Sequence, residues 1–539
     1  MHNSDLAHIK KRILESAFVN VEQGGADALM PDGSQVAWYF DFRCLFLEKD
    51  FLHVVARCFW HTYGANRRIC IGGIESAAIP LITGLVANGN DSSGFYIRKS
   101  RKKKTTMKQI EGRISNADIV LVDDLINTGS SFEKQLEILK SEGHAVTDIF
   151  VLIRLRDEKY YTNLTKHGVR IHSLFTSADF GLPMIEEKPP QTLEMKWSFA
   201  AKDPHFFEVT TKSIPVVEKE RLYIATDNGY VWCLDKHSGK ILWKSLVVLR
   251  KKKNQHTFTQ ITISEDKIIV GAANGSVYFL HITSGRILRV ISLSERIYTK
   301  VIPMQRRGLY VCGVSHKKAP YKNYLTAFTD CEKIWEVEIV GIPSSPLMHN
   351  GHNILITATN SGDVYAHDQS TGRLRWSYKT HSPIHNTGTP FHKGEYVAFS
   401  SYDGSVHILT TRTGMLHKKI RVADWLYASP LIDTGRIYTT SLDRSVYCHN
   451  LNTGDKIWEH ETRGRIFSAP VINAGYLYVG NNEGRLLVLD KNTGKECHHI
   501  YMSERITNPV VINEKNILVS TFADEIYCLY MPSNIGRPQ

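Results

Sequence analysis

The chain has 539 residues, a net charge of +12 and 42% hydrophobic residues. This length predicts two or more domains, and the apolar content is sufficient for their cores. No apolar run approaches the roughly 18 residues that a membrane-spanning helix needs, so we expect no membrane insertion. Nine cysteines without a CxxC pair argue against a disulfide framework or a zinc site and fit the cytoplasm. The positive charge permits an anionic partner without requiring one.

Helical and strand patterns alternate over residues 1–182, as in βαβ units. The chain begins with an amphipathic helical pattern that lacks the apolar core of a signal peptide. Strand patterns follow at 68–72, 119–122 and 148–155, and helical patterns at 77–87 and 132–141. We therefore predict a parallel, doubly wound α/β sheet that binds its ligands at the carboxyl ends of the strands.

Two segments between the first two of these strands have anion-binding chemistry. The turn GGIESAAIP places Gly73, Ile74, Glu75 and Ser76 directly after a strand. Small residues in such a turn let backbone N–H groups approach a pyrophosphate, although many strand–helix turns are rich in glycine. The next segment, YIRKSRKKKTT from Tyr96, has six Lys or Arg among its eleven residues. A run with so high a density of basic residues is a solvated loop, a nucleic-acid contact or a loop that binds a small anion.

The most informative segment is IVLVDDLINTGSS, from Ile119 to Ser131. A buried strand is predicted to end at Asp123 and Asp124, and an amphipathic helix follows a short polar turn. The backbone N–H groups and the dipole of that helix favour a phosphate, and the turn residues Asn127, Thr128, Gly129, Ser130 and Ser131 can add donors. Two adjacent carboxylates suit ribose hydroxyls or a magnesium ion shared with them. The segment therefore predicts a site for a phosphorylated sugar.

This segment resembles the signature of type I phosphoribosyltransferases that binds phosphoribosyl pyrophosphate (PRPP). The resemblance implies that Asp123 and Asp124 hold the ribose diol and that residues 127–131 hold the 5′-phosphate. The basic segment looks like the catalytic loop of orotate phosphoribosyltransferase, Arg-Lys-Glu-x-Lys-x-His-Gly. Arg98 and Lys99 match its first pair and Lys102 matches its lysine, whereas Ser100 and Lys104 replace its glutamate and histidine. These departures put the full rate of that family in question.

Two more segments resemble the base side of the same family. In MPDGSQVAWYFDFR, the family pattern is matched by Gly33, Tyr39, Phe40, Asp41 and Arg43. Pro31 replaces the lysine that approaches the orotate ring in the family. Arg156 in RLRDE matches an arginine that faces the base. The resemblance thus implies a conserved sugar-phosphate side and an altered base side.

The resemblance implies a glycosyltransferase that uses Mg²⁺, with Asp124, Lys99 and Lys102 in catalysis and a homodimer whose loops cross between subunits. Three functions stay open. The protein is an active phosphoribosyltransferase, a PRPP or nucleotide sensor without catalysis, or an effector of a retron-type or other anti-phage system. Pyrimidine synthesis does not need a large additional domain. Among active transferases, a housekeeping enzyme of pyrimidine synthesis is therefore the least expected version.

Residues 183–192 are rich in proline and charge and predict a linker. A repeat follows from residue 193 to 539, with an alternating strand, a Thr-Gly or Ser-Gly turn and often a Trp. Its copies begin at Gly229, Gly275, Gly362, Gly404, Arg444 and Gly484, with degenerate copies at 323–335 and 524–530. From Gly362 onward they start 40 to 42 residues apart, a period typical of a β-propeller.

We count eight units, or seven if the degenerate third one is an insertion. The last unit lacks an outer strand, and residues 193–200 carry the missing pattern, so we predict that this strand closes the ring. Trp243, Trp335, Trp376 and Trp458 are expected to pack between blades. The repeat resembles the PQQ-repeat propellers, yet no Cys-Cys pair is present, so we expect a cofactor-free scaffold that binds a protein partner.

Two basic clusters fall in predicted propeller loops, at residues 250–253 and 306–307. Ordinary solvated loops account for them. The more specific alternative is a contact with nucleic acid. Its signature would be a binding affinity that falls steeply as the salt concentration rises.

Overall fold

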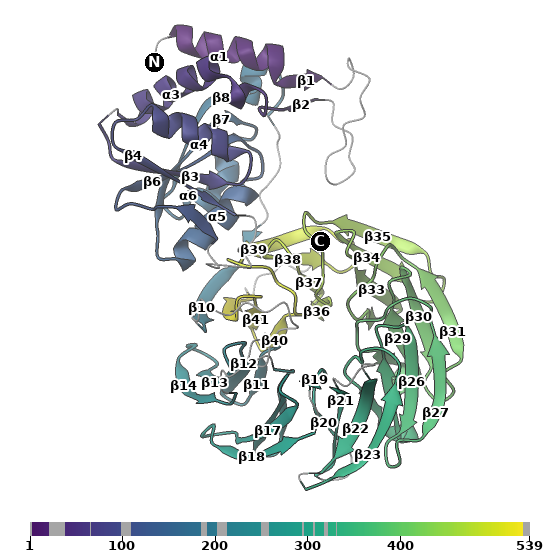
Figure 1. Ribbon diagram of the computed structural model, residues 1–539. Coiled ribbons are helices and arrows are strands. Elements are labelled where there is room, and N and C mark those ends of the chain that lie inside the picture. Colours follow the sequence, from purple (N-terminus) through teal and green to yellow (C-terminus); the bar gives the residue numbers. More distant parts are fainter. Residues whose placement is uncertain are drawn as a thin grey trace. The chain divides into compact units, whose positions relative to one another are not determined.

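The computed structural model describes residues 3–20, 38–64, 66–98, 109–184, 191–201, 213–248, 258–293, 296–304, 308–316, 322–329 and 331–531. The chain divides into two compact units, the first built from Met1–Thr192 with Tyr501–Ser503 and the second from Leu193–Ile500 and Glu504–Gln539. The first is an α/β unit and the second is a β-propeller (Figure 1). None of the helices among the described residues is long and apolar enough to span a bilayer.

A six-stranded sheet with the order β5-β4-β3-β6-β7-β8 forms the centre of the first unit. Strands β4, β3, β6, β7 and β8 are parallel, as predicted, whereas the short edge strand β5 is antiparallel to β4. The elements of the unit are α1 (Asn3–Ser16), β1 (Phe18–Asn20), β2 (Trp38–Phe40), η1 (Leu45–Leu47), α3 (Lys49–Tyr63), β3 (Ile69–Ile74), α4 (Ala78–Ala87), β4 (Ser92–Ile97), β5 (Ile110–Gly112), β6 (Asp118–Ile126), α5 (Ser130–Ser141), β7 (Val146–Arg154), η2 (Glu158–Tyr161), α6 (Thr162–Thr165), β8 (Arg170–Thr176), η3 (Ser177–Phe180) and β9 (Gln191–Thr192).

The alternation of side chains along β6 explains the two layers of helices. Val120 and Val122 pack into a core with α1, α3 and α4, while Ile119 and Leu121 pack into a second core with α5 and α6. Because successive side chains of a strand point to opposite faces, a strand that is apolar throughout is buried on both sides. The sheet is therefore doubly wound, as predicted.

The strand β6 is longer than predicted. It continues past Val122 to Ile126, because Leu125 and Ile126 keep their pairing with Ile153 and Arg154 of β7. The two acidic residues, the sixth and seventh of the nine in β6, thus lie within the strand rather than after its end, which fixes their backbone in the sheet.

Eight sheets of the second unit form the blades of a propeller, so the seven-blade alternative is wrong. The degenerate third repeat forms a complete blade. The strands, in blade order, are β11 (Val216–Glu218), β12 (Arg221–Ala225), β13 (Tyr230–Asp235), β14 (Ile241–Leu246); β15 (Thr262–Ser264), β16 (Lys267–Gly271), β17 (Ser276–His281), β18 (Ile287–Ser292); β19 (Arg296–Ile297), β20 (Ile302–Pro303), β21 (Tyr310–His316), β22 (Lys322–Phe328), β23 (Lys333–Ile339); β24 (Leu347–His349), β25 (Ile354–Ala358), β26 (Asp363–Asp368), β27 (Leu374–Lys379); β28 (Thr389–Phe391), β29 (Tyr396–Ser400), β30 (Ser405–Thr410), β31 (Leu416–Arg421); β32 (Leu431–Asp433), β33 (Arg436–Thr440), β34 (Ser445–Asn450), β35 (Lys456–Glu461); β36 (Val471–Asn473), β37 (Tyr476–Gly480), β38 (Arg485–Asp490), β39 (Glu496–Tyr501); and β40 (Val511–Asn513), β41 (Asn516–Ser520), β42 (Glu525–Tyr530) with β10 (Glu194–Ala200). Short 3₁₀ turns η4 (Asn350–His352) and η5 (His392–Gly394) lie in the fourth and fifth blades.

The ring closes as predicted, through the first strand of the unit. β10 pairs antiparallel with β42, from Glu194 opposite Tyr530 to Ala200 opposite Glu525. Phe199 of β10 is buried against Trp232 of the first blade, with ring centroids 5.3 Å apart. The eighth blade thereby gains its fourth strand, which covers an edge of β42 that would otherwise be open.

Tryptophans join neighbouring blades, as predicted. Each indole lies on the turn glycine of the following blade, where a Cβ atom would fall only 2.3 to 2.8 Å from the ring. The pairs are Trp243 with Gly285, Trp335 with Gly372, Trp376 with Gly414 and Trp458 with Gly494. Trp197 of β10 makes the same contact with Gly239. These glycines have a positive φ, from 68° to 73°, so a side chain there would be strained as well as crowded.

Candidate active site

The turn between β6 and α5 is built as a small polar loop on a helix N-terminus. Gly129 precedes α5 with a φ of 76°, and a Cβ atom there would lie 3.1 Å from the Leu164 side chain. Thr128 Oγ1 donates to Ser130 Oγ at 3.0 Å, and Gln135 Nε2 donates to Ser131 Oγ at 3.4 Å. The first N–H groups of α5 lack acceptors within the helix, so the turn presents donors and the positive end of a dipole to an anion.

Asp123 and Asp124 lie side by side at the carboxyl end of β6. Each carboxylate accepts from the next backbone N–H, that of Asp124 at 3.0 Å and that of Leu125 at 2.7 Å. Burial raises the pKa of Asp124, and the charge of Asp41 adds to that effect. A half-buried carboxylate of raised pKa is one that gains from a hydroxyl donor or a cation beside it.

Asp41 was not singled out as a site residue by the sequence, although its motif was. It follows β2, and Arg43 donates to it from Nε at 2.8 Å and from Nη2 at 2.5 Å. These hydrogen bonds lower the pKa of Asp41, which keeps this carboxylate ionised near Asp124. An interaction between residues so far apart in sequence has no local signal.

The turn between β3 and α4 lies next to the two acids, because β3 and β6 are neighbours. Gly72 is opposite Leu121 in the sheet. A Cβ atom on Gly73 would lie 2.7 Å from the carbonyl oxygen of Val122 and 2.6 Å from the Ala78 side chain. The glycine is therefore required by packing, and it brings Ile74, Glu75 and Ser76 to the edge where β6 ends. The peptide bond between Glu75 and Ser76 is cis.

The basic segment leaves the sheet at the same edge, between β4 and β5. Arg98, the last residue before it, donates its N–H to the Gln109 carbonyl at 2.8 Å, and its guanidinium lies 3.5 Å from the Glu111 carboxylate. The structure therefore defines both ends of the loop. Lys99 and Lys102 lie outside the described residues, as do Ser100, Lys104, Pro31 and Gly33.

Tyr39 and Phe40 fall on opposite faces of β2. Tyr39 is 36% exposed, whereas Phe40 is 8% exposed and lies among Phe18, Phe42 and Phe180. In a strand, neighbouring side chains face apart, so only one of this pair can point into a site. The arrangement favours Tyr39 as the residue available to a ligand and Phe40 as its packing support.

Arg156 reaches the turn between β6 and α5 rather than open solvent. Its Nε donates to Asn127 Oδ1 at 2.9 Å, its guanidinium lies 4.4 Å from the centre of the Tyr160 ring, and it is 5% exposed. Together these contacts hold the Asn127 side chain in place. The sequence indicated a base-facing role for Arg156, and the structure connects it to residues 127–131.

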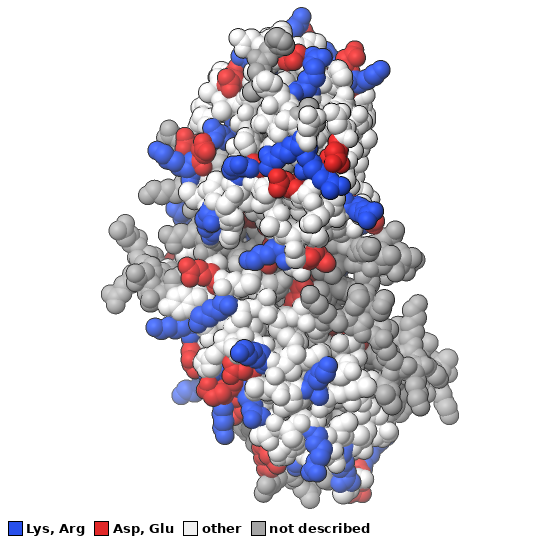
Figure 2. Space-filling model, turned by 90° about the vertical axis from the view of Figure 1, so that its left-hand side faces the viewer, with Lys and Arg blue, Asp and Glu red and all other residues white. Residues whose placement is uncertain are grey.

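The basic clusters at 250–253 and 306–307 lie outside the described residues. On the face of the molecule in Figure 2, the basic side chains are interspersed with acidic ones. The charge of the described residues on that face is therefore mixed.

Sequence comparisons identify relatives of the first unit. Orotate phosphoribosyltransferase of Pyrococcus abyssi is 31% identical over 157 residues, which cover 28% of this chain and 84% of the relative. Uridine 5′-monophosphate synthase of Bos taurus is 29% identical over 188 residues, 34% of this chain. The match spans 38% of the length of the bovine protein.

The second unit matches a family model described as outer membrane protein assembly factor BamB, over residues 192–290, 321–416 and 360–534. These ranges cover more than half of the chain. The crystal structure of BamB from Moraxella catarrhalis covers 63% of this chain and 100% of its own, with a TM-score of 0.51 and 14% identity, which shows the propeller fold alone. The chain therefore belongs to the orotate phosphoribosyltransferase family through its first unit and to this propeller family through its second.

Proposed function

We propose that the protein is a PRPP-dependent phosphoribosyltransferase, which transfers the 5-phosphoribosyl group to a nitrogen atom of a base or another acceptor. One observation carries the proposal: two acidic residues, a helix N-terminal turn and the Gly73 turn meet at one edge of the sheet, in a unit related to orotate phosphoribosyltransferases. We assign this activity to residues 1–182, with 183–192 as linker.

The contacts support one role for each group. The carboxylates of Asp123 and Asp124 accept from the ribose hydroxyls, and the turn 127–131 binds the 5′-phosphate. The turn Gly73 to Ser76 and the side chains of Arg98, Lys99 and Lys102 bind the diphosphate. Tyr39 contacts the acceptor base, with Phe40 behind it.

The reaction breaks the bond between C1 of the ribose and the diphosphate oxygen, and forms a bond from C1 to the acceptor nitrogen. The diphosphate leaves with the bonding electrons, and the acceptor nitrogen loses a proton to solvent. Charge builds up on the leaving group, so cations of the basic loop lower the barrier most when they lie near it. The acidic pair stabilises the positive charge that develops on the ribose.

Magnesium fits this site as an ion held mainly by the substrate. Among the described residues no group of three or more His, Cys, Asp or Glu side chains is placed to hold a metal, so a closed protein cage is not formed there. Two adjacent carboxylates with substrate oxygens suit the preference of Mg²⁺ for few protein ligands. Asp123 and Asp124 would hold the ion through ribose hydroxyls or water, and the ion would neutralise part of the diphosphate charge.

The test is to supply the protein with PRPP, Mg²⁺ and a panel of pyrimidine and purine bases and to measure diphosphate release. We expect release with at least one base and its loss when the metal is chelated. Because the base side is altered, orotate need not be the preferred acceptor. Saturable PRPP binding without release for any base would instead assign the protein as a sensor. Toxicity on induction that disappears in an Asp123→Asn/Asp124→Asn variant would point to an effector.

Arg156→Lys should weaken PRPP binding about tenfold or more, because the loss of a hydrogen bond from a charged donor costs about 1.5–3 kcal/mol. Lysine keeps the charge but not the planar guanidinium that reaches Asn127. The KM for PRPP measures the effect. Arg154→Lys is the matched control, since Arg154 pairs with the exposed Glu158 at 3.4 Å. Equal KM values in the two variants would contradict a role of Arg156 in positioning the phosphate turn.

We further propose that the propeller binds a protein partner and that the first unit forms a homodimer. Several outer strands of the blades expose apolar side chains, among them Ile241 and Leu242 of β14 and Ile287 and Leu288 of β18. Exposed apolar side chains that recur on neighbouring strands are typical of interaction surfaces. The molecular mass in solution, measured by light scattering, tests the dimer.

A further inference from the structure

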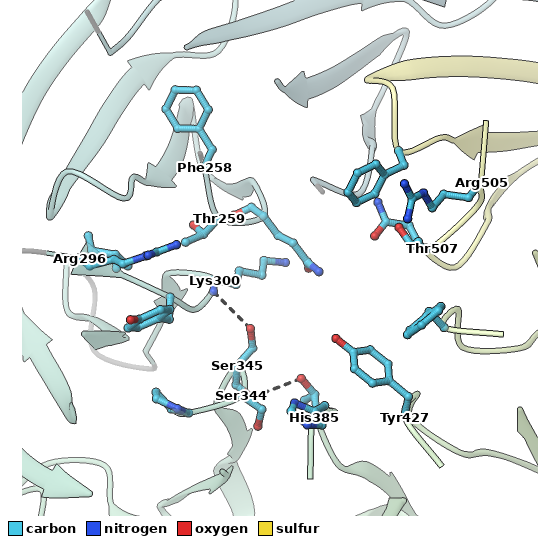
Figure 3. Close-up of a pocket in the computed structure, with 18 of the residues that line it drawn as sticks. Phe258, Thr259, Arg296, Lys300, Ser344, Ser345, His385, Tyr427, Arg505 and Thr507 are labelled. Atoms are coloured by element: carbon cyan, nitrogen blue, oxygen red, sulfur yellow. Dashed lines mark hydrogen bonds between the residues drawn. The ribbon is translucent and has the colours of Figure 1, made fainter. Parts of the chain in front are cut away.

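A cavity of about 540 Å³ lies among the innermost segments of the propeller blades. Residues from the second to the eighth blade line it, so it lies on the axis of the ring (Figure 3). Binding cavities for small molecules have about this size. The phosphoribosyltransferase proposal makes no use of this cavity.

The charged side chains that line the cavity are cationic. Among its described lining residues, Arg296, Lys300 and Arg505 are cations, and none is Asp or Glu. Arg505 has a carboxylate nearby, Glu504, at 3.4 Å. For Lys300, by contrast, no carboxylate of the described residues lies within ion-pair distance, and burial lowers its pKa. Figure 3 shows Arg296 and Lys300 on one side of the cavity and Arg505 and Tyr427 on the other.

The rings of His385, Tyr427 and Phe467 form one wall of the cavity. His385 and Tyr427 are stacked with ring centroids 5.2 Å apart and 14° between their planes. Phe467 lies edge-on to Tyr427 at 5.3 Å, and Tyr402 lies 4.9 Å from His385. These rings come from consecutive blades. Such a surface can stack a nucleobase irrespective of its sequence identity, because every base has a π-face.

We propose that this cavity binds a nucleoside phosphate, with the phosphate at Lys300 and the base on the wall of His385, Tyr427 and Phe467. A partly buried ammonium without a carboxylate is costly to the folded protein, and an anion beside it offsets that cost. The cavity also supplies amide and hydroxyl groups that can contact a ribose, from Gln260, Asn482 and Thr387. The proposal does not depend on catalysis by the first unit.

The experiment uses the full chain with uridine 5′-monophosphate, uridine and inorganic phosphate as probes. Calorimetric titration gives the affinities, and a photoreactive azido-uridine monophosphate, mapped by mass spectrometry, gives the position. To separate any binding at the first unit, the titrations are repeated in an Asp123→Asn/Asp124→Asn background. We expect cross-links near Tyr427 or Phe467 in both backgrounds, and tighter binding of the monophosphate than of either uridine or phosphate.

Lys300→Met should weaken this binding about tenfold or more, as expected for loss of a charged contact to phosphate. Lys495→Met is the matched control, because it removes the same charge from an exposed turn of the same unit. Without ligand, Lys300→Met should keep or raise the melting temperature. If Lys300 stabilised the fold, the same substitution would lower it. If that variant fails to fold, Tyr427→Ala serves with the same expected loss. Cross-links confined to residues 1–182, unchanged affinity in these variants, or equal affinity for phosphate and monophosphate would overturn the proposal.

Discussion

Asp124→Asn is expected to reduce phosphoribosyl transfer by on the order of a hundredfold while raising the melting temperature of the first unit at pH 7. In the proposed reaction this carboxylate accepts from a ribose hydroxyl, and hydrogen bonds to charged groups contribute up to about 3 kcal/mol. Asparagine keeps an oxygen for the Leu125 N–H, which now donates to Asp124 at 2.7 Å, so the local backbone should stay in place. Diphosphate release at saturating acceptor measures the first effect.

The gain in stability follows from the direction of the pKa shift. Burial raises the pKa of Asp124 in the folded protein, so folding favours its protonated form. The resulting stability is present below the pKa of the unfolded chain and is lost as the pH rises through the folded pKa. At pH 7 an aspartate of the unfolded chain is ionised, so burying this side chain on folding is a cost that asparagine removes. Activity has the opposite dependence and should fall on acidification at a higher pH than an ordinary aspartate would give.

Asp118→Asn is the matched control for this prediction. Asp118 lies at the other end of the same strand, where it pairs with Arg67 at 2.5 Å and is 45% exposed. The Asp118→Asn variant should leave phosphoribosyl transfer unchanged and should not raise the melting temperature. Full activity of Asp124→Asn, or a lower melting temperature than that of the native protein, would contradict the role given to this carboxylate.

Phe199→Asp should open the propeller ring and lower the free energy of unfolding of the second unit by about 3–5 kcal/mol or more. Loss of a buried phenylalanine side chain costs about that much, and an unpaired charge in its place adds to it. Phe199 is 8% exposed and packs on Trp232, between the last and the first blade. Seven of the nine tryptophans lie in this unit, so their fluorescence reports its unfolding in denaturant.

Ser198→Asp is the control, since it adds the same charge to the exposed face of β10. Its unfolding should match that of the native protein, and β10 of Phe199→Asp should become the first site of proteolysis. Equal stability of the two variants would show that β10 does not hold the ring closed.

The sequence was sufficient for features that depend on short-range patterns. The turn after Asp124 was predicted because a strand, a glycine with positive φ and a helix follow one another within a few residues. The eight blades were predicted because each repeat carries its own turn glycine and often a tryptophan that packs on the next blade. Even the closing strand was predicted, from an outer-strand pattern left without a blade.

The remainder of the site depends on contacts between distant segments. Residues 119–122 were apolar enough to predict a strand, but its extension to Ile126 depends on the pairing with β7. Equally, the pattern around Tyr39 and Phe40 matched a family motif without indicating that Phe40 is buried. The hydrogen bond from Arg156 to Asn127 joins residues on separate strand–helix connections, which no spacing in the sequence reveals.

The repeat itself carries a sequence signal for the position of Lys300. In five consecutive blades, the residue three positions before the proline at the start of the blade lines the cavity: Lys300, Pro343, Thr387, Tyr427 and Phe467. Aligning the repeats on that proline would have identified the axial position of each blade. A lysine there, among neutral residues, would then have been conspicuous.

Because β10 closes the ring, the propeller cannot be completed until β42 has been synthesised. More than 300 residues separate β10 from its partner β42, and at about 5–20 residues per second the ribosome needs on the order of 15–60 s to span them. Throughout that interval β10 has been synthesised without the strand it pairs with. Nascent chains of this protein therefore carry an unpaired strand, and chaperones or a second nascent chain have that time to reach it.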